Sequence, residues 1–133
     1  MPYLIDTDWA INAIGGDPQA LGTLRRLASL RLAVSWVTVA ELYESSFRSS
    51  NPQADLAITV RFLSPYVVLR PDLTTAERFA EIRAYLRNRG QLISDFDIVI
   101  AATALQHDLT LLSFNESGFN RIPDLRLYQT ERS

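Results

Sequence analysis

Short apolar runs that alternate with helix-like segments limit the fold of this chain more than any other feature. Five runs have the length and composition of buried strands: 2–6, 31–37, 66–70, 109–113 and 125–129. Helix signals lie between them, among them Asp17-Pro18 and Asn51-Pro52, in which a capping residue precedes a proline at the first helical position. This alternation favours an α/β domain built on a parallel sheet. We expect three layers, with helices flanking a mainly parallel five-stranded sheet, in a single domain over residues 1–133.

The expected helices have polar starts and apolar faces. They span about 18–30, 38–49, 52–63, 74–89 and 96–106. The last of these is apolar on nearly every side, so we expect it to be deeply packed. Its start is different, because Asp95 and Asp97 stand directly before the apolar run. Ionised carboxylates avoid dry interiors unless something pairs with them.

The composition removes several classes of chemistry. The chain has no cysteine, all thirteen basic residues are arginine, and His107 is the single histidine. Disulfides, zinc–thiolate sites, thiol nucleophiles, lysine Schiff bases and the P-loop lysine are thereby excluded. His107 lacks a nearby G-x-S-x-G motif and is interpreted as a helix-end residue. No apolar run reaches the roughly 18 residues of a membrane span, and no secretory signal pattern is seen, so we expect a cytoplasmic protein.

Four acids deserve both a structural and a functional interpretation. Asp6 ends the first strand, where a functional role is favoured over a turn cap. Thr38 and Glu41 form a capping-box pattern, so Glu41 is balanced between cap and site. Asp95 is expected to be the N-cap of the apolar helix, which leaves Asp97 to face a site. In parallel sheets, ligands bind beyond the carboxyl ends of the strands, where Asp6 and Glu41 should share one edge.

Carboxylates that converge repel one another, so either one stays protonated or a positive charge offsets the repulsion. A bound hard cation is the natural answer in a chain without lysine or cysteine. Mg²⁺ and Mn²⁺ prefer oxygen ligands and keep several waters. Such an ion can lower the pKa of a water and neutralise charge on a phosphodiester. The hypothesis is therefore a Mg²⁺ or Mn²⁺ site held by Asp6, Glu41 and Asp97.

Four sequence blocks resemble, in order, those of PIN-domain ribonucleases, and most closely the VapC-type toxins of toxin–antitoxin pairs. The blocks are "LIDTD", "TVAELYES", "AERFAEIRAYLRNRGQLISDFDIVIAATAL" and "LTLLSFNESGFNRIPDLRLY". The resemblance implies a PIN-like α/β fold, Mg²⁺- or Mn²⁺-dependent endoribonuclease activity, a homodimer, and inhibition by a cognate antitoxin. It places the family's three acids on Asp6, Glu41 and Asp97. The implied RNA substrate is a structured RNA with one accessible single-stranded loop.

The fourth block departs from the fullest family pattern. Ser113 stands where threonine is usual, and Asn115 followed by Glu116 stands where some relatives carry an aspartate. Ser113 and Asn115 are expected to position the scissile phosphate. Without a fourth acid here, one tightly held ion is preferred over two. Asp8 is a possible extra ligand, although a role as a turn cap is favoured. Candidate phosphate contacts elsewhere are the arginines Arg25, Arg26 and Arg48, for which a role as solvated surface residues is an equal alternative.

Two rival functions remain open. A D-x-D sequence after a strand also occurs in haloacid-dehalogenase-like phosphatases, with Asp6 as nucleophile, but the chain offers no basic lysine. A PIN fold that only binds RNA or a protein is the non-enzymatic alternative. For the expected dimer, apolar surface could come from Trp36, Phe47, Phe62 and Tyr66, although core packing is the favoured interpretation for each.

Overall fold

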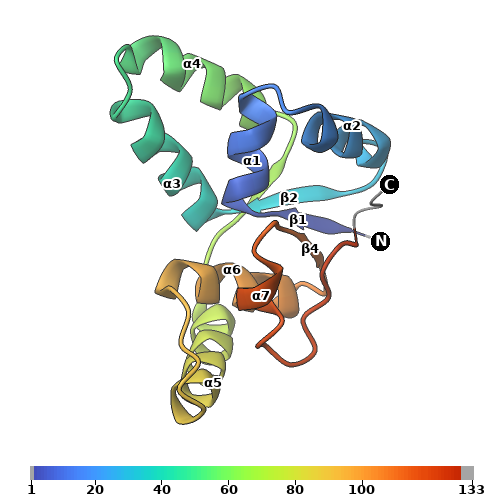
Figure 1. Ribbon diagram of the computed structural model, residues 1–133, viewed down its shortest axis with the longest axis vertical. Coiled ribbons are helices and arrows are strands. Elements are labelled where there is room, and N and C mark those ends of the chain that lie inside the picture. The colour runs from blue at the N-terminus through green and yellow to red at the C-terminus, as the bar shows by residue number, and fades with distance from the viewer. Residues whose placement is uncertain (1, 130–133) are drawn as a thin grey trace.

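The computed structural model describes residues 2–129, and Figure 1 shows the arrangement of their helices and strands. In chain order these are β1 (Tyr3–Ile5), α1 (Thr7–Ile14), α2 (Pro18–Leu27), β2 (Leu32–Ser35), α3 (Trp36–Phe47), α4 (Pro52–Leu63), β3 (Val67–Leu69), α5 (Leu73–Asn88), α6 (Asp95–Gln106), β4 (Thr110–Leu112) and α7 (Glu116–Phe119). The Asp17 and Asn51 side chains accept hydrogen bonds from Ala20 and Ala54 N–H, so both proline helices begin as their sequences predict.

The sheet is parallel throughout, in the order β3-β2-β1-β4. The predicted α/β architecture is confirmed, but the prediction of five strands is wrong, because the described residues form four. Among the described residues, the segment expected as a fifth strand pairs with the sheet through its backbone at a single isolated bridge, between Leu127 and Leu111. Leu111 uses both backbone groups there, accepting from Tyr128 N–H and donating to the carbonyl of Arg126. The pairing is thus one residue long.

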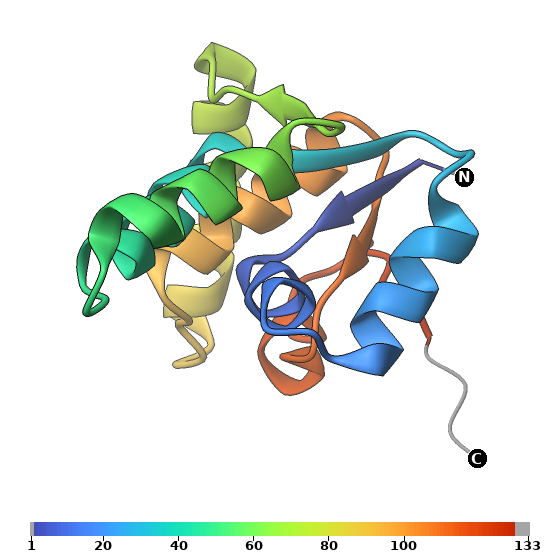
Figure 2. The same cartoon turned by 90° about the horizontal axis from the view of Figure 1, so that it is seen from above.

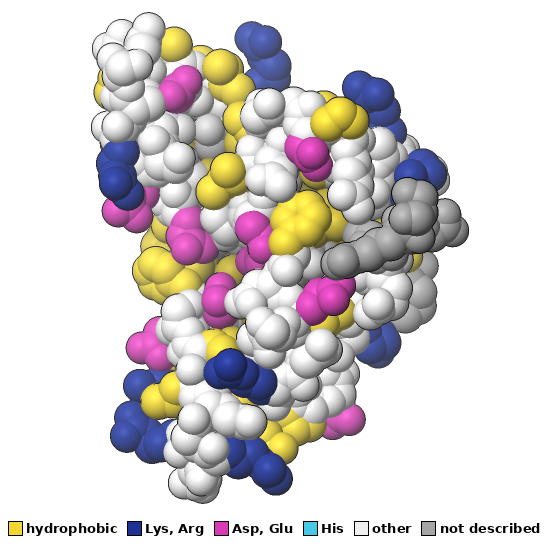
Figure 3. Space-filling view, in the orientation of Figure 1, with side chains coloured by type: hydrophobic (Ala, Val, Ile, Leu, Met, Phe, Trp, Pro, Cys, Tyr) yellow, Lys and Arg dark blue, Asp and Glu magenta, His cyan; other side chains and the backbone are white. Residues whose placement is uncertain are grey.

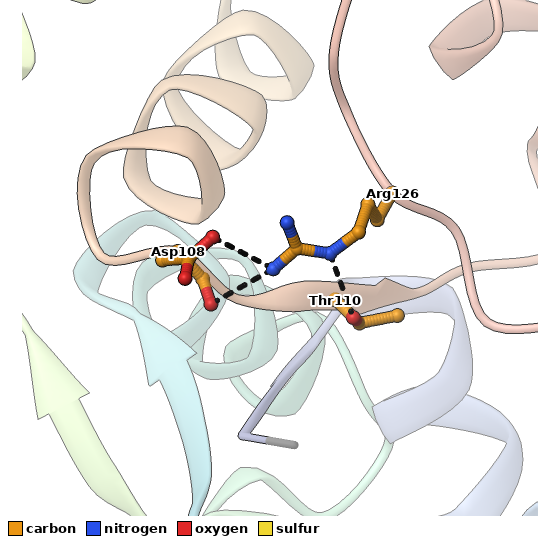
Figure 4. A network of polar contacts seen from close by, with 3 residues as sticks. All are labelled: Asp108, Thr110 and Arg126. Atoms are coloured by element: carbon orange, nitrogen blue, oxygen red, sulfur yellow. Dashed lines mark hydrogen bonds and ion pairs between the residues drawn. The ribbon is translucent and has the colours of Figure 1, made fainter.

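A side-chain network holds that final segment against the sheet. Nη2 of Arg126 donates to the carboxylate of Asp108 at 2.8 Å and to its backbone carbonyl at 3.1 Å, as Figure 4 shows. Nε of Arg126 donates to the Thr110 hydroxyl at 3.5 Å. Asp108 has a positive φ of 56°, a conformation that aspartate adopts more readily than most residues. The segment is anchored through its arginine rather than through a ladder of strand hydrogen bonds.

The two faces of the sheet bury separate apolar cores. Successive strand residues point to opposite faces, so Leu4 and Leu111 join one core while Ile5 and Leu112 join the other. The first core is completed by α5, α6 and α7, and the second by α1, α2 and parts of α3 and α4. Figures 1 and 2 show these helices on either side of the strands. The predicted three layers are therefore present, and Ile98 and Ile100 of α6 are fully buried.

Two helices begin at other residues than the sequence predicted. α3 begins at Trp36 with Ser35 as its N-cap, so Thr38 lies inside the helix and the capping-box interpretation of Thr38 and Glu41 is wrong. α6 begins at Asp95 with Ser94 as its N-cap, so the prediction that Asp95 is the cap is also wrong. In both helices the N-cap is a serine that precedes the predicted cap residue in the sequence. A serine hydroxyl caps as well as an aspartate carboxylate does.

Helices α3 and α4 lie side by side, as Figure 2 shows, and join through a buried hydroxyl pair. Oγ of Ser46 and Oγ1 of Thr59 are 2.9 Å apart. Trp36 and Phe47 at the ends of α3 are 52% and 62% exposed, so the core-packing interpretation is wrong for these two side chains. Along residues 2–129, no helix is both long and apolar enough to cross a membrane.

Candidate active site

The carboxyl edge of the sheet brings together residues that are far apart in the sequence. β1 ends before Asp6, β2 leads into α3, and β4 ends before Ser113. Because the strands are parallel, these ends lie at one edge, where α1 and α3 begin. Figure 3 shows acidic side chains gathered in the middle of this face of the molecule, with most arginines toward its periphery. The edge is thus an acidic surface with a buried centre.

Asp6 is the most deeply buried of these acids, with 5% of its surface exposed. Its Oδ1 accepts from Thr7 N–H at 2.8 Å, and its Oδ2 accepts from the Ser113 hydroxyl at 2.7 Å. Its pKa is raised from 3.8 to about 7, mainly by burial and in smaller part by the charges of Asp8 and Asp97, while both hydrogen bonds act to lower it. Asp6 is therefore a carboxyl that the fold holds at an energetic cost.

Glu41 is reached from α1 through Thr7. The hydroxyl of Thr7 donates to Oε1 of Glu41 at 2.6 Å and also contacts the hydroxyl of Thr38 at 3.1 Å. Thr7 stands between Asp6 and the second acid, so it fixes the relative positions of α1 and α3 at this edge. The sequence analysis did not single out Thr7. Its position beside Asp6 at the end of a strand was the available signal.

Asp97 lies in the first turn of α6, and its backbone N–H donates a hydrogen bond to Oγ of Ser94 at 3.2 Å. Burial raises the pKa of its carboxyl. Its charge is the smallest of the causes that raise the pKa of Asp6. Asp95 instead lies on the exposed side and pairs with Arg83, from Oδ1 to Nε at 2.9 Å.

Asp8 does not cap the turn after Asp6, as the sequence suggested, because Asp6 itself is the N-cap of α1. Oδ2 of Asp8 accepts from the backbone N–H of Phe114 at 3.0 Å and contacts the Ser113 hydroxyl at 3.4 Å. Its Oδ1 is buried without a hydrogen-bond partner among the described residues. Burial raises the pKa of this carboxyl as well. Asp8 ties the segment after β4 to the start of α1.

Ser113 and Asn115 occupy different kinds of position. Ser113 is buried, donates to Asp6, and accepts from the backbone N–H of Asn115 at 3.0 Å. Asn115 is the N-cap of α7, where its Oδ1 accepts from Gly118 N–H at 3.3 Å. A Cβ on Gly118 would approach the Asn115 amide nitrogen to 2.7 Å, so a larger residue there would make the Asn115 side chain shift. Glu116 lies in the first turn of that short helix.

Arginines contribute unequally to this edge. A cavity of about 470 Å³ beside the acids is lined by Thr7, Glu41 and Glu44, with Arg48 among its other walls. Arg26 belongs elsewhere, because its guanidinium donates to the hydroxyls of Thr23 and Tyr128. Of the candidate phosphate contacts, Arg48 is the one that the structure brings next to an acid of the predicted site.

The oxygen-rich edge fits a hard divalent cation in its chemistry. The carboxylates repel one another, and the buried Oδ1 of Asp8 has no hydrogen-bond partner within residues 2–129. Within residues 2–129, however, no group of three His, Cys, Asp or Glu side chains stands arranged to hold a metal ion. The assignment of Asp6, Glu41 and Asp97 as metal ligands therefore stays a prediction.

Comparison with known proteins identifies the family. Residues 3–125 match the family model described as the PIN domain, so the chain belongs to the PIN-domain family. Ribonuclease VapC2 of Haemophilus influenzae is 34% identical over 126 residues, covering 95% of this chain and 96% of that protein. The tRNA(fMet)-specific endonuclease VapC of Salmonella typhimurium is 29% identical over 127 residues, covering 96% of each. These relatives confirm the resemblance to VapC-type ribonucleases.

Solved structures agree with this result. The complex VapBC2 from Rickettsia felis, bound to a DNA fragment from its promoter, contains a chain that superposes with a TM-score of 0.92 at 27% identity. The superposition covers 98% of this chain and all of that one. The DNA-bound VapBC of Salmonella typhimurium gives a TM-score of 0.90 at 29% identity, covering 96% of this chain and 97% of that one. Both neighbours are toxin–antitoxin complexes.

Proposed function

We propose that this protein is a VapC-type endoribonuclease, the toxin of a toxin–antitoxin pair, which cuts RNA phosphodiester bonds with the help of Mg²⁺ or Mn²⁺. The observation that carries the proposal is the buried Asp6 carboxyl, whose pKa is raised to about 7 at the acidic edge of a PIN fold. Perturbed carboxyls in a cluster are typical of functional sites. The names of the curated relatives support the reaction class.

Asp6, Glu41 and Asp97 are the residues that would hold the cation. When bound, such an ion supplies positive charge for the phosphodiester and lowers the pKa of a water. The chain's own contribution is to keep these carboxyls in place and partly shielded from solvent. Ser113 orients Oδ2 of Asp6 through its hydrogen bond, and Thr7 orients Oε1 of Glu41.

Positioning of the RNA would fall to groups around this edge. The Ser113 hydroxyl and the Asn115 amide lie on the segment after β4, and both are already fixed by hydrogen bonds within the fold. Arg48 lines the cavity beside Glu41, where a guanidinium can contact a phosphate. These contacts would place a phosphodiester across the acidic edge, with Asp6 near its centre.

The partners in this proposal are an RNA substrate, a cognate antitoxin and a second copy of the chain. The solved neighbours are VapBC complexes, which supports an antitoxin. The exposed Trp36 and Phe47 offer apolar surface for protein contacts. Expression of the protein should be toxic, and co-expression with the product of a neighbouring gene should relieve the toxicity.

The catalytic assignment is tested with purified protein, Mn²⁺ and total RNA. We expect Asp6→Asn and Asp97→Asn to lose about a hundredfold or more of the cleavage rate, because each removes a charge that the cation needs. Asp124→Asn is the matched control, since Asp124 is exposed and has a φ of 68° that asparagine also adopts. Equal cleavage by all four proteins would reveal a contaminating nuclease and overturn the assignment.

The non-enzymatic alternative makes the opposite prediction. A PIN fold that only binds RNA or a protein would leave total RNA intact with Mn²⁺, Mg²⁺ or EDTA alike. One observation keeps this alternative in view, namely that no three-ligand set stands arranged among the described side chains. The haloacid-dehalogenase alternative no longer applies, because the chain belongs to the PIN-domain family.

A further inference from the structure

Two aromatic rings stack at the side of the acidic edge. The rings of Trp9 and Phe114 have centroids 4.9 Å apart and an interplanar angle of 15°. Trp9 is fully buried, and its indole Nε1 has no hydrogen-bond partner among the described residues. Packing alone therefore holds the indole, between Phe114 and the edge-on ring of Tyr128. Phe114 is 40% exposed. One face of its ring packs on the indole of Trp9, so the opposite face is the one exposed to solvent.

The exposed ring is held within the candidate active site. Phe114 follows Ser113, whose hydroxyl donates to Asp6, and its own backbone N–H donates to Asp8 at 3.0 Å. Hydrogen bonds thus join Glu41 to Thr7, Thr7 to Asp6, and Asp6 to Ser113, the residue that precedes Phe114. Figure 3 shows apolar surface directly beside the central acidic side chains. The ring lies at one end of this series of residues, and the cavity lined by Arg48 lies at the other.

The charge of this edge makes an uncharged contact valuable. Carboxylates repel RNA phosphates, and the chain as a whole carries a net charge of −2. Stacking on an aromatic ring needs no charge and tolerates any base, because every nucleobase has a π face. Unpaired bases in RNA loops are commonly recognised in this way. A pre-positioned ring also loses little conformational freedom on binding, since Trp9 already fixes its orientation.

We propose that Phe114 forms a stacking subsite for one unpaired nucleobase of the RNA, beside the phosphate that is cut. The inference rests on the endoribonuclease function proposed above. A purely structural role, covering the indole of Trp9, requires apolar volume but no aromatic face. Leucine supplies the first and lacks the second, so Phe114→Leu separates the two roles.

The first test uses the shortest single-stranded oligoribonucleotide that spans a cleavage site mapped in total RNA. We expect Phe114→Leu to lower kcat/KM about tenfold, mainly by raising KM, as the loss of one base–aromatic stack would. Phe114→Tyr should keep most of the wild-type value. The matched control is Phe62→Leu, because Phe62 also packs on another aromatic ring, at 5.3 Å from Tyr66, but at the opposite edge of the sheet.

The second test leaves the protein unchanged and alters the RNA. Single abasic sites are placed in turn at each position around the cleaved bond. One position should lower kcat/KM about tenfold for the wild type, and the same abasic RNA should make Phe114→Leu and wild type equal. A variant that merely folded poorly would be slower than the wild type on the abasic RNA as well, so equal rates on that RNA separate lost stacking from lost folding.

The outcomes separate this inference from the proposed function. If wild type and Asp6→Asn cut RNA equally or not at all, the proposed endoribonuclease fails. If the wild type cuts but neither Phe114→Leu nor any abasic position matters, the stacking subsite alone is overturned. A change in the mass of the assembly in Phe114→Leu, with kcat/KM unaltered, would assign the ring to a protein contact and likewise overturn the inference.

Discussion

Replacing Asp6 by asparagine should stabilise the metal-free protein while abolishing its activity. The pKa of Asp6 rises from 3.8 to about 7 on folding, mainly through burial. A carboxyl with a higher pKa in the folded state binds its proton more tightly there than in the unfolded chain. The free energy of unfolding therefore falls as the pH rises from about 4 to about 7, and stays lowered above that. Asparagine carries no charge and escapes this loss.

The magnitude follows from the same quantities. One pH unit is worth about 1.4 kcal/mol, so full ionisation of Asp6 costs about 4 kcal/mol at pH 8. The pKa of about 7 already includes the lowering effect of the hydrogen bonds from Thr7 and Ser113. Asparagine has a single acceptor oxygen for these two donors, so the variant gives up one neutral hydrogen bond, worth about 1 kcal/mol. The net gain for Asp6→Asn is therefore about 3 kcal/mol at pH 8. It should shrink to about 1 kcal/mol at pH 5, where the folded protein keeps the Asp6 proton but much of the unfolded chain does not.

The assay is urea unfolding in EDTA at pH 5 and pH 8, at one protein concentration so that any dimer contributes equally. Adding Mn²⁺ should then raise the stability of the wild type at pH 8 but not that of Asp6→Asn, since a ligand stabilises only the form that binds it. A variant less stable than the wild type at pH 8 in EDTA would refute the argument, because Asp6 would then support the fold instead of straining it.

Three further substitutions have separable effects. Ser113→Ala removes the hydroxyl that donates to Asp6 and should lower the cleavage rate about tenfold, with a change in its pH profile, because the pKa of Asp6 rises further. Ser46→Ala leaves the buried Thr59 hydroxyl without its partner and should reduce the free energy of unfolding by about 1–3 kcal/mol in a urea titration, without altering the cleavage rate per folded molecule. Ile98→Ala should cost about 2–5 kcal/mol in the same titration, because this fully buried side chain leaves a cavity; a smaller loss would mean that the core collapses around it.

Much of the architecture could be predicted because it is encoded locally. Apolar runs, proline after a capping residue, and alternating element types gave the helices and the parallel sheet. The fifth strand could not be excluded in this way. The run at 125–129 is apolar enough for a strand, but whether it pairs along its length depends on contacts such as that of Arg126 with Asp108, which join distant residues. Helix starts were missed where Ser35 and Ser94 took the cap positions.

The candidate site shows the same division between local pattern and distant contact. Asp6 could be singled out because an acid that ends a buried strand needs an explanation, and the structure places it at the buried centre of the acidic edge. The side chains that orient this edge could not, because Thr7 reaches Glu41 and Asp8 reaches Phe114 across 34 and 106 residues of sequence. No periodicity encodes such pairs.

The hydrogen bond from Thr7 to Glu41 gives one further prediction. Because Thr7 orients Glu41, Thr7→Val should raise the Mn²⁺ concentration needed for half-maximal cleavage. If Thr7 only tied α1 to α3, Thr7→Val would lower stability and leave the metal dependence of cleavage unchanged.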